Sequence, residues 1–220
     1  MGAKLAILVG AVVAVAVLIG FYIGFLTGGP TPYRPPAASA AGGRSVDLTL
    51  QTVAAVGSKL SPNKNWVSYL VREQGVWHRS TVWTLPANTL VHVTIYNFDG
   101  KSGLRNPFLA QARGLVGGSF ELDGKPTAAI NPDDASHTFA IPSMGVIVPI
   151  KGVDDNAPHQ CDYAPCPMSN AHHTITFTFR TGKKGHYRWQ CFVPCAAGFV
   201  YGFGGPMQTI GYMDGYVNVV

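Results

Sequence analysis

The sequence has few charged residues and no long basic run. Only 12% of its 220 residues are Asp, Glu, Lys or Arg, and the formal net charge of +5 is scattered along the chain. A nucleic-acid-binding protein would concentrate such charge in a patch or stripe. The sequence also offers no Gly-rich phosphate loop, no paired-carboxylate arrangement and no Ser-His-Asp order. Nucleic-acid binding, nucleotide chemistry and hydrolysis are therefore disfavoured.

Sustained helical periodicity is also missing, except at the N-terminus. Leu5 to Thr27 form a run of 23 residues without a charge, and Gly28-Gly29-Pro30 ends it. A helix of that length can cross a bilayer. Ala38-Ser39-Ala40 could serve as a signal-peptide cleavage site, but the apolar core of a signal peptide is shorter, about 7–15 residues. We predict an uncleaved, single-pass anchor over residues 1–27 in the cell membrane, with the rest of the chain on the extracytoplasmic side.

The remaining chain divides by composition into a linker and one domain. Residues 28–43 are rich in Pro, Ala and Gly, which predicts a partly extended tether. Residues 44–220 contain short alternating or β-branched runs separated by turn signals, a pattern typical of an antiparallel β-sandwich. Two long stretches with little alternation, at about 99–134 and 156–171, are predicted insertions. The predicted strands lie at 46–53, 66–71, 81–85, 90–96, 136–141, 173–179, 186–192 and 212–219.

Cysteine is scarce, since the chain has four. Cys161 and Cys166 have a spacing that permits a loop disulfide or a soft metal clip. The disulfide is favoured, because proline lies between them and no second paired motif accompanies them. Cys191 and Cys195 could form disulfides, with each other or with the first pair, or they could supply two sulfur ligands to a metal.

Three segments of the chain resemble one known family. They are residues 84–99 with the sequence TLPANTLVHVTIYNFD, residues 136–142 with the sequence SHTFAIP, and the stretch that begins Gly185-His186-Tyr187 and leads to Cys191. Together they resemble the cupredoxin family, and most closely the CuA domain of cytochrome oxidase subunit II. The resemblance extends over residues 85–220. It implies an all-β, cupredoxin-like antiparallel Greek-key β-sandwich that binds copper, here joined to an N-terminal transmembrane helix.

The same resemblance implies a set of metal ligands. It places His137 as an imidazole ligand, Cys191 and Cys195 as bridging thiolates, and Met213 as a weak thioether ligand. Soft thiolates with imidazole suit copper in both of its oxidation states. The implied cofactor is therefore copper in a CuA-like or partly degenerate site.

One family position differs in this sequence. In the family a second histidine lies three residues before the methionine, and that position is Ile210 here. His172 or His173 is an alternative source of imidazole, although adjacent residues of a strand face opposite ways, so at most one faces the core. Met207 is a weaker sulfur candidate than Met213, because the turn alone explains the Gly and Pro before it.

These features predict a copper module that receives electrons from a small redox donor protein and passes them to a membrane respiratory oxidase. Other subunits of that complex, and the membrane, are the predicted partners. The chain has no Cys-x-x-Cys-His heme attachment and only one span, so any oxygen reduction would belong to a partner subunit. Two alternatives stay open, namely a copper-free structural or assembly subunit and a protein that holds cuprous ion for delivery.

Overall fold

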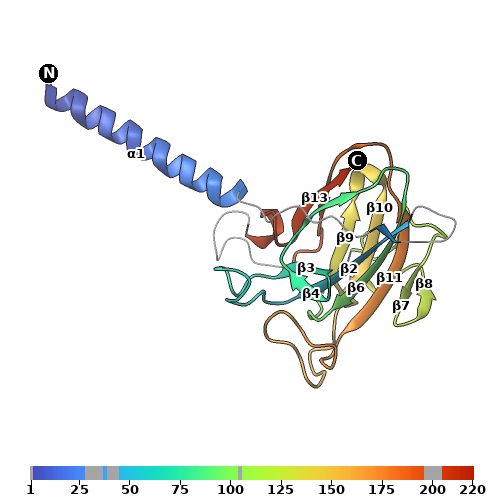
Figure 1. The fold of residues 1–220 in the computed structure, drawn as a ribbon. Helices are drawn as coiled ribbons and strands as arrows, with labels where there is room; N and C mark the ends of the chain where they lie inside the picture. The colour runs from blue at the N-terminus through green and yellow to red at the C-terminus, as the bar shows by residue number, and fades with distance from the viewer. Residues whose placement is uncertain (1, 28–36, 39–44, 104–105, 196–204) are drawn as a thin grey trace.

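The computed structural model describes residues 2–27, 37–38, 45–103, 106–195 and 205–220, which form an N-terminal helix and two β-sheets (Figure 1). The helix, α1, spans Gly2–Thr27. Its residues Ala6–Ile23 have a mean hydropathy of 2.8, and none of them is buried. By length and composition, α1 could be a membrane anchor or a signal sequence. Most of the predicted linker at 28–43 lies outside the described residues.

The larger sheet has eight strands. Its strand order is β4-β3-β2-β6-β11-β7-β8, and β1 pairs with β2. All of these pairs are antiparallel except β2 with β6. The strands are β1 (Ala37–Ala38), β2 (Ser45–Val53), β3 (Ser68–Glu73), β4 (Val76–His78), β6 (Leu90–Asn97), β7 (Phe120–Leu122), β8 (Lys125–Thr127) and β11 (His173–Arg180).

The smaller sheet has five strands in the order β10-β9-β12-β13-β5. Its pairs are antiparallel except β13 with β5. The strands are β5 (Val82–Leu85), β9 (Ala135–Ile141), β10 (Val146–Lys151), β12 (Gly185–Gln190) and β13 (Asp214–Val219). Short 3-10 helices in the described chain are η1 (Pro132–Asp134), η2 (Pro142–Met144) and η3 (Pro206–Gln208).

An apolar core fills the space between the two sheets. Along β6, the inward residues Val91, Val93 and Ile95 are buried, as the two-residue period of a strand requires. At the centre, the rings of Trp83 and Trp189 stack with centroids 4.8 Å apart. Their indole N–H groups donate to the backbone carbonyls of Ser80 and Thr81, at 3.0 and 2.7 Å. Large buried side chains of this kind contribute about 1.5–3 kcal/mol each, and they make the frame rigid.

The two-sheet sandwich confirms the predicted fold class. The two parallel strand pairs were not predicted, because alternation along a strand shows which residues face inward but not which strand lies beside it. Within the predicted insertion at 99–134, β7 and β8 form a hairpin that adds to the edge of β11, with Thr176 opposite Glu121.

Four loops meet at one end of the sandwich. Asn97, at the end of β6, is paired with both Thr52 of β2 and His173 of β11. The side chain of Asn97 also donates to the carbonyl of Lys151, at the end of β10. The loops that follow β2, β6, β10 and β12 therefore leave the sheets at this end, which we call the site end. The opposite end carries the turn between β11 and β12.

Candidate metal centre

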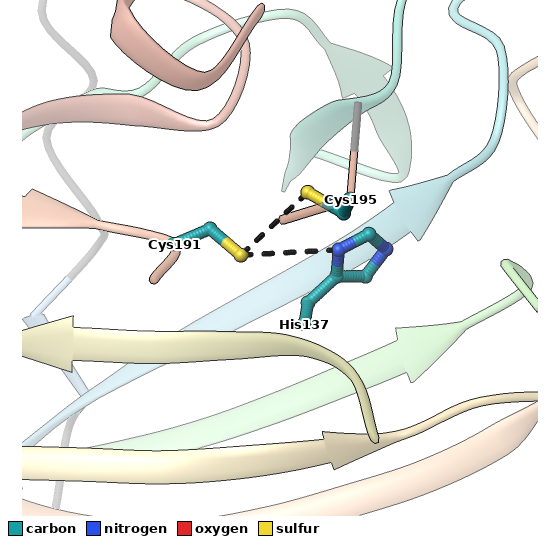
Figure 2. Close-up of side chains that lie close together, drawn as sticks. All are labelled: His137, Cys191 and Cys195. Carbon is teal, nitrogen blue, oxygen red and sulfur yellow. Dashed lines mark hydrogen bonds between the residues drawn. The ribbon is translucent and has the colours of Figure 1, made fainter. Parts of the chain in front are cut away.

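Three predicted ligands converge at the site end. His137 is on β9, Cys191 directly follows β12, and Cys195 lies one short turn further on. Figure 2 shows the three side chains pointing toward one another: the sulfur of Cys191 is 4.0 Å from Nδ1 of His137 and 3.7 Å from the sulfur of Cys195. The three ligand atoms all lie within 4.8 Å of one another. The structure therefore brings two sulfurs and one imidazole nitrogen to a single point.

Backbone and side-chain hydrogen bonds fix the position of Cys191. The N–H of Thr138 donates to the Cys191 sulfur at 3.4 Å, and the hydroxyl of Thr138 accepts from the N–H of Phe192 at 2.8 Å. The N–H of Cys191 donates to the carbonyl of Met213 at 3.0 Å. Cys191 and His137 are fully buried, whereas Cys195 is partly buried. These contacts with β9 and with the residue before β13 hold the Cys191 sulfur beside His137.

Asp99 occupies the far side of the His137 ring. Its Oδ2 lies 3.0 Å from Nε2 of His137, an ion-pair distance, although the approach falls outside hydrogen-bond geometry. Its Oδ1 accepts from the N–H of Gly100 at 2.7 Å, and its own N–H donates to the side chain of Asn97 at 3.2 Å. A carboxylate at one ring nitrogen leaves the other nitrogen free for a metal and orients the ring. Asp99 carries no sequence signal as a site residue, because a long segment separates it from His137.

The charges in this cluster are coupled. Burial disfavours a charged imidazole, but Asp99 and Cys191 outweigh it and raise the pKa of His137 to about 9. Burial also opposes ionisation of Cys191, yet the hydrogen bond from Cys195 and the charge of His137 lower the pKa of this thiol well below its usual range. The hydrogen bond to Cys191, together with burial, raises the pKa of Cys195 well above its usual range. These opposed shifts favour ionisation of Cys191 over ionisation of Cys195.

The two candidate methionines take different positions. Met207, on η3, places its sulfur 3.1 Å from the sulfur of Cys195. Met213 is fully buried in the main core and meets Cys191 through its backbone carbonyl. The methionine ranked lower from the sequence therefore supplies the sulfur contact that the structure shows. A Pro-initiated turn at Pro206 positions it, and the sequence predicts that turn but not the contact that follows from it.

No second imidazole joins the cluster within the described residues. Ile210 forms a backbone bridge with Asp214. His172 packs against the rings of Tyr96 and Phe98, with centroids 5.9 and 5.0 Å away. His173 pairs instead with Asp123 at the edge of the β7–β8 hairpin, where Nδ1 lies 2.7 Å from Oδ2. Residues 196–204, between Cys195 and η3, lie outside the described residues and contain no histidine.

The chain was compared with known families, curated proteins and solved structures. No known family profile and no curated protein matches it. Reduced rusticyanin is 15% identical, with 84% of this chain and 89% of that chain covered and a TM-score of 0.31. Rusticyanin from Thiobacillus ferrooxidans is 16% identical, with 84% and 87% covered and a TM-score of 0.31. A multi-copper oxidase from Pediococcus acidilactici is 11% identical, with 87% and 29% covered and a TM-score of 0.34.

The fold is a two-sheet β-sandwich whose structural neighbours are cupredoxin-like. Superpositions this loose describe neither ligands nor function. The cupredoxin-like sandwich predicted from the sequence is confirmed at this level, and the closer likeness to the CuA domain of subunit II remains a prediction.

The four cysteines of the chain divide into two pairs. Cys161 and Cys166 form a disulfide, as predicted, with a Cα–Cα distance of 5.8 Å. Cys191 and Cys195 are free thiols. The structure therefore does not have the alternative disulfides that involve Cys191 or Cys195, and both sulfurs are available as ligands.

Asp99 provides a test of how the imidazole is held. We expect Asp99→Asn to weaken copper binding about 10–100-fold at pH 9.5, because the ring loses its orienting carboxylate. Near pH 7 the difference should shrink. There, Nδ1 of the wild-type His137 must lose a proton whose pKa is about 9 before it can bind copper. The copper affinity of the wild type therefore rises with pH up to about 9, whereas that of the variant stops rising at a lower pH. Competition titrations with a copper chelator across this pH range would measure both. Equal pH profiles would contradict the assignment.

Met207 provides a second test. We expect Met207→Leu to lower copper affinity about tenfold and to shift the reduction potential, since a thioether ligand is lost. Met213→Leu is the matched control. It should leave copper binding unchanged and cost less than about 1.5 kcal/mol of stability, because the side-chain volumes are similar. Chelator competition and thermal unfolding distinguish the two variants, and the reverse pattern would restore Met213 as the ligand.

Proposed function

We propose that this chain is a membrane-anchored copper electron-transfer module on the extracytoplasmic side, similar to oxidase subunit II. In this proposal it accepts electrons from a small redox donor and passes them to a membrane respiratory oxidase. The observation that carries the proposal is the convergence of the His137 nitrogen with the two free sulfurs of Cys191 and Cys195. The chain itself would not catalyse a reaction, and reduction of a terminal acceptor would belong to a partner subunit.

The donor set fits copper. Two cysteine sulfurs 3.7 Å apart can both bind a soft ion, and His137 presents the nitrogen that Asp99 leaves free. Met207 adds a thioether beside Cys195. These four side chains would hold the copper, which supplies one-electron redox chemistry when bound. The hydrogen bonds at Thr138 and the stacked core behind it hold the ligands in place, so a change of charge would require little movement.

Burial supports electron transfer over delivery of an ion. A protein that transfers copper to a partner exchanges ligands with it, and that step needs accessible thiols. Here Cys191 and His137 are fully buried, and only Cys195 and Met207 are partly open. Electrons can pass through the protein that covers these buried ligands, whereas a copper ion needs an open path to leave the site.

The strongest second candidate is a protein that holds cuprous ion. It is favoured by one observation, namely that the described cluster offers sulfur and a single imidazole, with Ile210 in place of the second histidine. Sulfur-rich sites select the cuprous state. A copper-free structural or assembly subunit is the third candidate.

One experiment separates these candidates. The full chain in detergent would be loaded with copper under reducing and then oxidising conditions, and copper content, optical absorption and electron paramagnetic resonance would be recorded. Reversible oxidation, with either two coppers sharing one unpaired electron or one copper with an intense thiolate absorption, would support electron transfer. One cuprous ion that does not oxidise reversibly would support copper holding. A fully folded chain that retains no copper would overturn both.

A further inference from the structure

The copper proposal gives no role to the disulfide loop, which contains Cys161 and Cys166 and lies at the site end. It follows β10 and lies against the loop that follows β2. Between the two loops is a cavity of about 420 Å³, lined by residues 57–59, Lys64 and residues 163–165. That volume is in the range of pockets that hold small molecules. None of its lining residues belongs to the cluster of His137, Cys191 and Cys195.

The cavity is built from firmly held backbone. The buried side chain of Gln51 accepts from the N–H of Cys166 at 3.0 Å and donates to the carbonyl of the same residue at 2.8 Å. The N–H of Ala164 donates to the carbonyl of Ala55 at 3.0 Å. The Cys161–Cys166 disulfide closes the loop between these contacts. The cavity is therefore preformed.

Two lysines give the cavity its charge. Lys59 and Lys64 are exposed at its wall, and neither forms an ion pair anywhere in the part of the chain that the structure describes. No acidic residue lines the cavity. Two ammonium groups at one concave site, with no carboxylate to neutralise them, attract an anion of more than one charge.

Apart from Ser58, the remaining wall is apolar or aromatic. Tyr163 is 52% exposed, and Gly57 lets it approach, since a Cβ at Gly57 would lie 3.3 Å from that of Tyr163. Gly57 has a φ of +76°, so a side chain there would be strained as well as crowded. Tyr163 and Pro165 can cover the organic part of a ligand while the lysines face its charge.

We propose that this cavity binds a phosphate group, either free in small phosphorylated molecules or as part of a lipid headgroup. Lysine serves phosphate as a mobile point charge with three donors, and a doubly charged phosphate can engage both Lys59 and Lys64. The role of the disulfide loop is then to form one wall of this site. Phosphate binding here does not depend on whether copper binds at the other cluster.

The test is an amide-shift titration by nuclear magnetic resonance. The isotope-labelled full chain in a zwitterionic detergent would be titrated with inorganic phosphate at constant ionic strength, with the amides of Gly57, Ser58 and Ala164 as reporters. We expect saturable shifts in the wild type. In Lys59→Gln/Lys64→Gln the phosphate affinity derived from them should fall by about tenfold. Lys183→Gln/Lys184→Gln removes the same charge from the turn between β11 and β12, at the opposite end, and should change nothing.

A second arm distinguishes the source of the phosphate. The chain would be placed in nanodiscs of phosphatidylcholine alone or with phosphatidylglycerol. Reporter shifts that need the anionic lipid, together with Lys59 and Lys64, would assign the site to a lipid headgroup. Saturable shifts with inorganic phosphate would assign it to a free ligand. Shifts that never saturate in either arm, or that fall equally in both lysine variants, would overturn the proposal.

Discussion

Cys191→Ser is expected to remove copper from the chain completely while the fold survives. The sulfur of Cys191 lies close to both other ligand atoms, 4.0 Å from the nitrogen of His137 and 3.7 Å from the sulfur of Cys195. A serine hydroxyl is a hard donor that ionises far less readily, so it does not replace a thiolate for copper. The hydroxyl can still accept from the N–H of Thr138, which keeps the buried position satisfied. Copper content after desalting, with near-ultraviolet circular dichroism as the check of folding, measures the result.

The matched control removes the other cysteine pair. Cys161→Ser/Cys166→Ser should keep full copper content, because that pair is in a separate loop and joined as a disulfide. It should lower the free energy of unfolding by about 2 kcal/mol, since the loop that the disulfide closes is short. Equal loss of copper from both variants would show that the cysteines have been assigned to the wrong pairs.

The ligands that the sequence could predict are those that short segments carry. His137 lies in a strand motif, and Cys191 and Cys195 lie in one loop, so the resemblance to the cupredoxin family could be carried over to each of them. Asp99 and Met207 reach the cluster only through tertiary structure. Asp99 approaches the ring because Asn97 holds the end of β6 against β10. Met207 lies on η3, which places its sulfur beside that of Cys195. No local pattern encodes either approach.

The same distinction applies to the fold. The apolar run of α1 and the alternation of β6 and β11 are local signals, and the structure has both elements. The parallel pairing of β5 with β13 depends on which strands become neighbours, and a two-residue period carries no information on this. The phosphate cavity is likewise formed by two loops that are far apart in the sequence, so neither loop alone predicts it.

Gly215→Ala is expected to have the largest effect on the fold itself. Gly215 lies on β13 opposite Trp189, and a Cβ at this position would be 1.8 Å from the backbone carbonyl oxygen of Thr81. That oxygen cannot move aside, because it accepts from the indole of Trp189 at 2.7 Å and from the N–H of Tyr216 at 3.0 Å. The methyl group must therefore separate β5 from β13. We expect a loss of at least about 3 kcal/mol in the free energy of unfolding.

The consequence should extend to the metal centre. β13 begins directly after Met213, whose carbonyl accepts from the N–H of Cys191, so a displaced β13 removes a support of the thiolate. Gly182→Ala is the control, because a Cβ there meets only the hydroxyl of Tyr187, at 3.8 Å. Thermal unfolding and copper content would be measured on both variants. A Gly215 variant as stable as the control would mean that β5 and β13 are not packed as closely as the structure has them, and the position of Cys191 would then need to be explained without them.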